Sequence, residues 1–211
     1  MSALAPPAAP VALAMTGASG AQYGLRLLEC LLGAGERVYL MLSRPAQVVI
    51  GSETDWALPG RPAEVARVLG DRFGAADGQL RVFGQEEWTA PVASGSATAR
   101  AMVVCPCSMA TISSLAVGAS RNLIERAGDV MIKEGRRLIV VPRETPFSAI
   151  HLDNLLRLAR AGVVVLPANP GFYHRPNTVG EIVDFIVARV LDQLGVAHDL
   201  GPRWGQERDE D

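Results

Sequence analysis

VALAMTGASGAQYGLRLLECLLGAG, residues 11–35, decides the fold. The stretch begins with a short apolar run at 11–15 and continues through small and polar residues at 16–20. It then places leucines at helical spacing until glycines end the pattern. An apolar run, a glycine-containing turn and an amphipathic helix are typical of the first strand, turn and helix of a doubly wound parallel sheet. The stretch therefore predicts an α/β fold of the Rossmann-like or flavodoxin-like type.

Strands and helices continue to alternate along the chain. Continuous β-branched runs between helices predict a parallel sheet covered on both faces, which makes three layers. Thr145-Pro146 is a good N-cap and first-residue pair for a helix, and Thr178-x-x-Glu181 predicts a capping box. The helix at 108–117 is so apolar that we expect it to have no solvent-exposed face. We expect strands near 38–42, 80–83, 101–105, 138–141 and 163–166, and helices near 44–53, 62–73, 108–117, 122–133, 145–161 and 178–194.

Composition excludes several classes of protein. The chain has 211 residues, 49% hydrophobic and 20% charged, which fits one domain over 11–200 with tails at 1–10 and 201–211. Lys and Arg total 20 against 22 Asp and Glu, so nucleic acid is not an expected partner. Three cysteines are too few for a disulfide framework and favour the cytoplasm. No apolar run reaches the roughly 18 residues of a membrane-spanning helix.

The loops that follow the strands are the expected ligand sites, because ligands of such sheets bind beyond the carboxyl ends of the strands. In the first loop, Gly17, Gly20 and Gly24 are spaced differently from the glycines of a G-x-G-x-x-G motif. One interpretation is a phosphate at residues 19–20, bound by the free amides of the helix start. The other is a tight turn that needs glycine.

A second loop, PCSMAT at 106–111, opens a helix in the same way after the fourth strand. It offers hydroxyls at Ser108 and Thr111 to a second anion or to a ring edge. Cys105 and Cys107 invite a metal or nucleophile interpretation, but no histidine lies near them in sequence. We therefore expect no metal site and predict that both cysteines pack as small hydrophobic residues.

Three further groups of residues carry possible chemistry. Arg126 and Lys133 are two helical turns apart and share a face, which is either a solvated face or a clamp on a phosphate. Glu144 lies between a strand and a helix, where a carboxylate either complements the helix dipole or performs acid/base work. GFYHRP at 171–176, with Arg189 in the last helix, suits a ligand with a phosphate and an unsaturated apolar part.

Six ordered motifs resemble those of one known family, the UbiX-type flavin prenyltransferases. They are TGASGAQYG (16–24), the loop at Ser43, CPCSMAT (105–111), NLIERAGDVMIKE (122–134), VPRETPF (141–147) and PGFYHRP (170–176), followed by VARVLDQLG (187–195). The resemblance runs from residue 11 to Trp204. It implies a transferase that joins the five-carbon unit of dimethylallyl monophosphate to N5 and C6 of reduced FMN without a metal ion. The product would be prenylated FMN, the cofactor of partner UbiD-type decarboxylases.

By position, the resemblance also implies which residues bind each substrate. FMN would be held by Ala18, Ser19, Gly20, Ser43, Ser108, Met109, Ala110, Thr111 and Arg143. The allylic phosphate would be bound by Tyr173, Arg189, Arg126 and Lys133, with Trp88 and Trp204 near the substrate. Ser19 would organise the N5 side of the flavin, and Glu144 would handle the proton. The family assembles as a dodecamer, so we expect the two tryptophans to act across subunit boundaries.

The chain departs from the family pattern at two positions, and other functions are also considered. Gly135 interrupts a stretch that is more basic in the family, and Ala110 stands where related flavoproteins carry a polar residue. Ala110 argues against a phosphopantothenoylcysteine-type decarboxylase, and the missing Tyr-x-x-x-Lys pair argues against a short-chain NAD(P) reductase. A direct aromatic-acid decarboxylase and a flavin-binding storage protein stay open. The pathway served, quinone synthesis or aromatic-acid metabolism, stays open as well.

Overall fold

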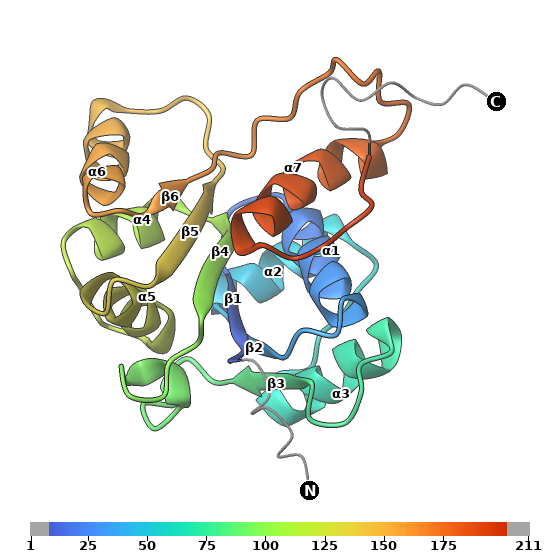
Figure 1. The fold of residues 1–211 in the computed structure, drawn as a ribbon, viewed down its shortest axis with the longest axis horizontal. Helices are drawn as coiled ribbons and strands as arrows, with labels where there is room; N and C mark the ends of the chain where they lie inside the picture. The colour runs from blue at the N-terminus through green and yellow to red at the C-terminus, as the bar shows by residue number, and fades with distance from the viewer. Residues whose placement is uncertain (1–8, 202–211) are drawn as a thin grey trace, which may run out of the picture.

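Six parallel strands form the centre of the protein, and helices cover both faces of the sheet (Figure 1). The computed structural model describes residues 9–201. The strands are β1 (Val11–Met15), β2 (Val38–Leu42), β3 (Leu80–Phe83), β4 (Ala101–Cys107), β5 (Arg137–Pro142) and β6 (Val164–Val165). Their order in the sheet is β3-β2-β1-β4-β5-β6. The order changes direction between β1 and β4, which is the switch point where ligands of doubly wound sheets bind.

Two hydrophobic cores, one on each face of the sheet, hold the layers together. The helices are α1 (Ala21–Gly33), α2 (Arg44–Glu53), α3 (Pro62–Phe73), α4 (Met109–Ala116), α5 (Leu123–Lys133), α6 (Ala149–Arg160) and α7 (Val179–Leu194), with a 3-10 helix, η1 (Pro91–Ala93). Side chains alternate along β1, so Leu13 joins the core with α1, α2, α3 and α7, whereas Ala12 and Ala14 join the core with α4, α5 and α6. Burial of one such leucine stabilises the fold by roughly 1.5–3 kcal/mol.

The predicted three-layer fold is confirmed, but the predicted start of α6 is wrong. α6 begins at Ala149 rather than at Pro146. The Ser148 hydroxyl accepts a hydrogen bond from the His151 amide at 3.2 Å, and Nδ1 of His151 accepts one from the Ser148 amide at 3.3 Å. Because this reciprocal cap satisfies free amides at the helix start, Thr145 and Pro146 remain in the loop after β5.

Two smaller predictions also need correction. Thr178 caps α7 by accepting a hydrogen bond from the Glu181 amide at 3.2 Å, but the Glu181 carboxylate accepts one from the Asn177 amide instead of completing the capping box. α4 exposes Ala110 and Ser113, so in the single chain it has a solvent-exposed face. Within residues 9–201, no helix has the length and apolar character that a membrane crossing requires. The predicted tails fall mostly outside the described residues.

Candidate functional site

The turn after β1 leads into α1, and a carboxylate from α2 occupies the start of that helix. Gly20 adopts a left-handed conformation with a φ of 102°, which favours glycine. The amides of Gly20 and Ala21 both donate to Oε2 of Glu53, at 2.8 and 2.9 Å. The positive end of the α1 dipole is therefore neutralised by a side chain from another helix.

Glu53 also interacts with two of the predicted site residues. Partial burial raises the pKa of Glu53. The Ser19 side chain, the two amides and the charge of Arg143 lower it, and together they outweigh the effect of burial. The net pKa lies below the ordinary value, so the carboxylate is ionised at neutral pH. Glu53 was not among the residues predicted from the sequence, because its contact with Gly20 spans 33 residues and no motif marks it. The one signal in the sequence that could have indicated Glu53 was its position as the last residue of the helix that follows β2.

Thr16 joins the turn after β1 to the loop after β4. Its buried hydroxyl donates to the Pro106 carbonyl at 3.0 Å and accepts a hydrogen bond from the Ser108 amide at 2.8 Å. The Thr16 amide donates to the same carbonyl at 3.1 Å. Ser108 in turn caps α4, with its hydroxyl 3.1 Å from the hydroxyl of Thr111. The two loops therefore form one hydrogen-bonded unit.

Two more loops join this unit at the carboxyl edge of the sheet. Ser43 caps α2, and its amide donates to the Met15 carbonyl at 3.0 Å. Arg143 directly follows β5 and donates from Nε to the Ser19 carbonyl at 3.2 Å. Glu144 comes next, and its carboxylate accepts a hydrogen bond from the Thr145 amide at 3.2 Å. The structure thus gathers at one edge the residues predicted to hold flavin, namely Ala18, Ser19, Gly20, Ser43, Ser108, Met109, Ala110, Thr111 and Arg143.

This edge suits the flavin mononucleotide that the sequence resemblance implies. Its loops supply hydroxyls and backbone amides, and Arg143 supplies a guanidinium, a group well suited to phosphate or to a ring carbonyl. The loops also approach one another closely. A Cβ added at Gly17 would lie 2.4 Å from Cβ of Pro45, so a larger residue there would push the first turn away from α2. The donor set and the close approach both fit a ligand held largely by backbone groups.

A second group of predicted residues lies along α7. The ring of Tyr173 packs edge-on against Phe185, with 5.8 Å between the ring centroids. Phe185 and Arg189 are four residues apart, so they lie on the same side of α7, one turn from each other. The side chain of Arg189 is 55% exposed and forms an ion pair with Asp192 at 2.7 Å. Through its contact with Phe185, the ring of Tyr173 therefore lies beside α7 one turn before Arg189.

A third group lies on α5, which covers the opposite face of the sheet from α7. Arg126 donates to the Ala93 carbonyl at 3.0 Å, and Lys133 ends the helix. Because α5 ends shortly before β5 begins, Lys133 lies at the amino edge of the sheet. Arg143 follows the carboxyl end of β5, about 17 Å further along a strand of six residues. In the single chain, Lys133 therefore lies far from the flavin loops along the sheet, and the basic residues of α5 are on the opposite face of the sheet from Arg189 of α7.

The two predicted tryptophans are not placed in a site by the single chain. Trp88 lies in the connection between β3 and η1 and is 48% exposed. Trp204 lies outside the described residues. The roles of both residues stay predictions.

Cys105 and Cys107, the cysteines of β4, are buried, as the sequence predicts. Cys105 and Cys107 are both inaccessible to solvent. Burial raises the pKa of both thiols well above the ordinary value, so neither is a thiolate at neutral pH. They act as small hydrophobic residues in the cores on the two faces of the sheet.

A doubly wound sheet with polar loops gathered at its switch point is an arrangement found in flavoproteins, and the Flavoprotein family model matches residues 6–191 of this chain. The chain is 56% identical over 197 residues to flavin prenyltransferase UbiX of Pseudomonas aeruginosa, with 93% of this chain and 94% of the relative covered. The chain belongs to the UbiX family of flavin prenyltransferases, as its motifs predict, and is thus an enzyme of the transferase class.

Two solved structures resemble the chain over nearly its whole length. AnUbiX (PadA1), in complex with FMN and dimethylallyl pyrophosphate, is 38% identical with a TM-score of 0.84, and the match covers 95% of this chain and 100% of that chain. A dodecameric FMN-dependent UbiX-like decarboxylase from Escherichia coli O157:H7 is 39% identical with a TM-score of 0.83, covering 93% and 100%. Both similarities agree with the fold class predicted from the sequence.

Proposed function

We propose that this protein joins the dimethylallyl unit of dimethylallyl monophosphate to N5 and C6 of reduced FMN, and so makes prenylated FMN for a UbiD-type decarboxylase. The observation that carries the proposal is the hydrogen-bonded cluster of loops at the carboxyl edge, in a chain 56% identical to a flavin prenyltransferase. Reduced FMN supplies the electron-rich ring atoms to which the new bonds form.

The loops at the carboxyl edge bind and orient the flavin in this proposal. Arg143 is held against the Ser19 carbonyl, which fixes the guanidinium beside the first turn. The ionised carboxylate of Glu53 accepts hydrogen bonds from the Gly20 and Ala21 amides beside Ser19, and in this proposal it holds the first turn so that the Ser19 hydroxyl lies on the N5 side. The bond between Thr16 and Ser108 keeps the loop after β4 in register with the first turn.

The transfer itself needs both positive charge and aromatic faces. Breaking the allylic C–O bond sends the electron pair to the departing phosphate and leaves an allyl cation. Arg126, Lys133 and Arg189 supply positive charge, and the ring of Tyr173 supplies an aromatic face. Forming the second bond, at C6, would use up the remaining double bond of the five-carbon unit, so one alkene carbon would have to gain a proton while C6 loses its ring proton. Glu144 or the departing phosphate would accept the C6 proton, and the same two groups are the nearest sources of the proton for the alkene carbon.

The phosphate-binding residues can meet only between copies of the chain. Tyr173 and Arg189 belong to the α7 side of the sheet, whereas the basic residues of α5 belong to the other side. We therefore propose a homo-oligomer, a dodecamer like the Escherichia coli relative, in which neighbouring copies complete each site. The predicted roles of Trp88 and Trp204 across subunit boundaries are part of this proposal.

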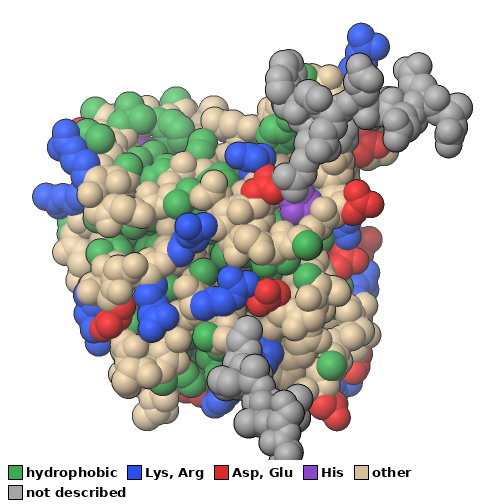
Figure 2. Space-filling model, viewed as in Figure 1, with side chains coloured by type: hydrophobic (Ala, Val, Ile, Leu, Met, Phe, Trp, Pro, Cys, Tyr) green, Lys and Arg blue, Asp and Glu red, His purple; other side chains and the backbone are tan. Residues whose placement is uncertain are grey.

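Exposed apolar side chains on α6 support such an assembly. Ile150, Leu152 and Leu156 are 70%, 54% and 48% exposed although all three side chains are apolar. Figure 2 shows hydrophobic side chains gathered at the upper left of the surface, where Figure 1 places α6. Clustered apolar side chains on a surface mark an interaction site.

Mass spectrometry of the flavin tests the proposal directly. The protein is incubated anaerobically with FMNH2 and dimethylallyl phosphate in the presence of EDTA, and the recovered flavin is expected to have gained one C5 unit. Flavin of unchanged mass with EDTA and without it contradicts the proposed function, whereas product only without EDTA contradicts metal independence. Glu144→Gln is expected to retain FMN and to form less product, and unchanged turnover in that variant removes Glu144 from the mechanism.

A direct decarboxylase is the second candidate, because the Escherichia coli relative is described as an FMN-dependent decarboxylase. The two functions differ in what the pure protein does with an aromatic acid. Our proposal expects no CO2 release by the protein alone and release once a UbiD-type enzyme is supplied with its product. CO2 release by the FMN-loaded protein alone supports the second candidate.

We also propose that the protein works in the cytoplasm. All three cysteines lie within the described residues, and all three are free thiols. Free thiols fit a reducing compartment.

A further inference from the structure

We propose that His198 and Asp192 are positioning residues for Arg189 and thereby set the affinity of the enzyme for the allylic phosphate. This inference rests on the proposed function, in which Arg189 binds that phosphate. It assigns a role to the segment after α7, which the site residues discussed so far leave unexplained.

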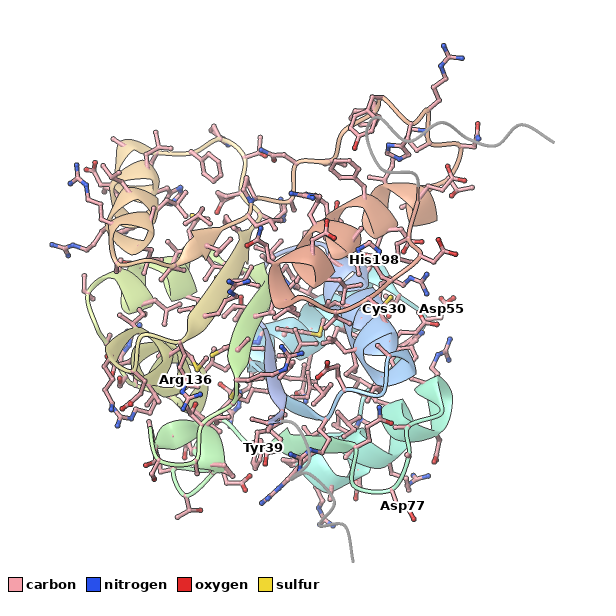
Figure 3. All side chains as sticks on the ribbon, in the orientation of Figure 1. Cys30, Tyr39, Asp55, Asp77, Arg136 and His198 are labelled. Carbon is pink, nitrogen blue, oxygen red and sulfur yellow. The ribbon has the colours of Figure 1, made fainter. Side chains whose placement is uncertain are left out.

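Three side chains form a hydrogen-bonded row at the end of α7. Nη1 of Arg189 donates to Oδ2 of Asp192 at 2.7 Å. Nε2 of His198 lies 3.2 Å from the other carboxylate oxygen, Oδ1. His198 comes from the segment that follows α7 and packs back against this helix (Figure 3). The Asp192 carboxylate is therefore held from both sides, which fixes the direction in which it faces Arg189.

The backbone determines which nitrogen of His198 carries the proton. The Leu200 amide donates to Nδ1 of His198 at 3.2 Å, so Nδ1 is an acceptor. The proton of the neutral ring is then on Nε2, which donates to Asp192. The hydrogen bonds thus run in one direction, from the Leu200 backbone through His198 to Asp192.

Exposure increases along the row toward the expected ligand. The side chain of His198 is 7% exposed, that of Asp192 is 24% exposed and that of Arg189 is 55% exposed. The ion pair uses one terminal nitrogen of Arg189, and a guanidinium has five N–H donors in total. A buried support with an exposed guanidinium is the arrangement expected of a preorganised anion-binding arginine, because the bound rotamer is already populated before the phosphate arrives.

A second ion pair on α7 provides a matched control. Arg26 on α1 donates from Nε to Oδ1 of Asp184 at 2.7 Å, a distance equal to that between Arg189 and Asp192. This pair connects α1 to α7 and involves none of the predicted phosphate-binding residues. Asp184→Asn therefore removes an arginine–aspartate pair from the same helix without disturbing Arg189.

The test measures binding of dimethylallyl phosphate to the full-length, FMN-loaded protein by calorimetry, alongside steady-state kinetics. His198→Leu is expected to raise the Kd and KM for dimethylallyl phosphate about tenfold, with kcat and FMN affinity unchanged within about twofold. His198→Gln, whose amide donates near the position of Nε2, is expected to restore most of the affinity. Asp192→Asn should match His198→Leu, and the double variant should lose no more than Asp192→Asn alone, because both residues act through one contact.

Three results would overturn the inference. These are wild-type affinity in His198→Leu, an equal loss in His198→Gln, or an equal loss in the Asp184→Asn control. Where His198→Leu does not fold, Asp192→Asn with its control gives the same decision. Wild-type protein that neither binds dimethylallyl phosphate nor modifies flavin contradicts the proposed function itself, and the inference with it. If the wild-type protein binds dimethylallyl phosphate and the variants bind it equally well, the inference is wrong but the proposed function is not contradicted.

Discussion

Replacing Thr16 with valine should weaken both the fold and flavin binding, because one hydroxyl joins the two central loops of the site. Valine has nearly the same shape as threonine but can neither donate to the Pro106 carbonyl nor accept from the Ser108 amide. The Pro106 carbonyl keeps a second donor, the Thr16 amide, at 3.1 Å. The Ser108 amide loses its 2.8 Å acceptor, so the damage is concentrated at that amide.

The expected cost follows from these contacts. An amide left without an acceptor away from water costs about 1–3 kcal/mol, and the lost bond to the Pro106 carbonyl adds about 1 kcal/mol. Because the Ser108 amide is only partly buried, we expect Thr16→Val to lower the free energy of unfolding by about 2–3 kcal/mol. Thr16→Ser keeps the hydroxyl and loses one methyl group, which costs about 1 kcal/mol.

Urea unfolding of the two variants and the wild type measures this difference. All three are compared at one protein concentration, because the stability of an oligomer depends on concentration. A parallel titration of FMN, followed by flavin fluorescence, should show weaker binding in Thr16→Val than in Thr16→Ser. If the valine variant is as stable as the serine variant and binds FMN equally well, the hydroxyl does not hold the two loops together and the reasoning is wrong.

Three further predictions concern packing, charge and assembly. Gly24→Ala should lower the free energy of unfolding by about 1–3 kcal/mol in thermal or urea unfolding, because the added Cβ would lie 2.4 Å from a backbone carbonyl of β4. Gly33→Ala is the control and should be neutral or stabilising, because apart from its chain neighbours and its own helix backbone no atom lies within 4 Å of the added Cβ. Because the folded-state pKa of Glu53 lies below its ordinary value of 4.5, its ionised form stabilises the fold above that pH and the contribution is lost as the pH falls through the folded-state pKa. Glu53→Gln should therefore reduce the free energy of unfolding at pH 7 and have little effect at acid pH; equal effects at both would contradict the charge argument. Ile150→Glu should lower the mass of the assembly in sedimentation experiments, whereas Ala63→Glu on α3 should not, and an intact assembly in Ile150→Glu would exclude α6 from the interface.

Local signals were sufficient for most of the fold because strands and helices carry distinct periodicities. α2 and α3 lie where the spacing of apolar residues and the first-turn prolines predict them. The start of α6 was mispredicted because two candidate caps, Thr145 and Ser148, lie three residues apart. Sequence favoured the threonine followed by proline, whereas the structure uses the serine whose hydroxyl and amide both pair with His151. Two competing local signals are separated only by the contacts that form.

The site was predictable where it depends on strand ends and unpredictable where it depends on long-range contacts. The rule that ligands bind at the carboxyl edge identified the loops at Ser19, Ser43 and Arg143 without any structure. Helical spacing placed Arg126 and Lys133 on one face of a helix, but spacing cannot say which layer of the sheet that helix covers. The structure answers that question, and the answer is what makes an assembly necessary for the proposed phosphate site.

The position of Glu53 changes how the first turn should be understood. Free amides at the start of α1 suggested a phosphate at residues 19–20, but the amides of Gly20 and Ala21 already donate to an ionised carboxylate. A phosphate placed there would compete with Glu53 for the same donors and would meet its negative charge at close range. The exposed hydroxyl of Ser19 has no such conflict, because a hydroxyl beside the Glu53 carboxylate can donate to it and still accept a hydrogen bond from a ligand. The first turn is therefore better suited to the uncharged edge of a ring than to a phosphate, which agrees with a role for Ser19 at N5 and leaves the charged groups of the ligands to the arginines and lysine.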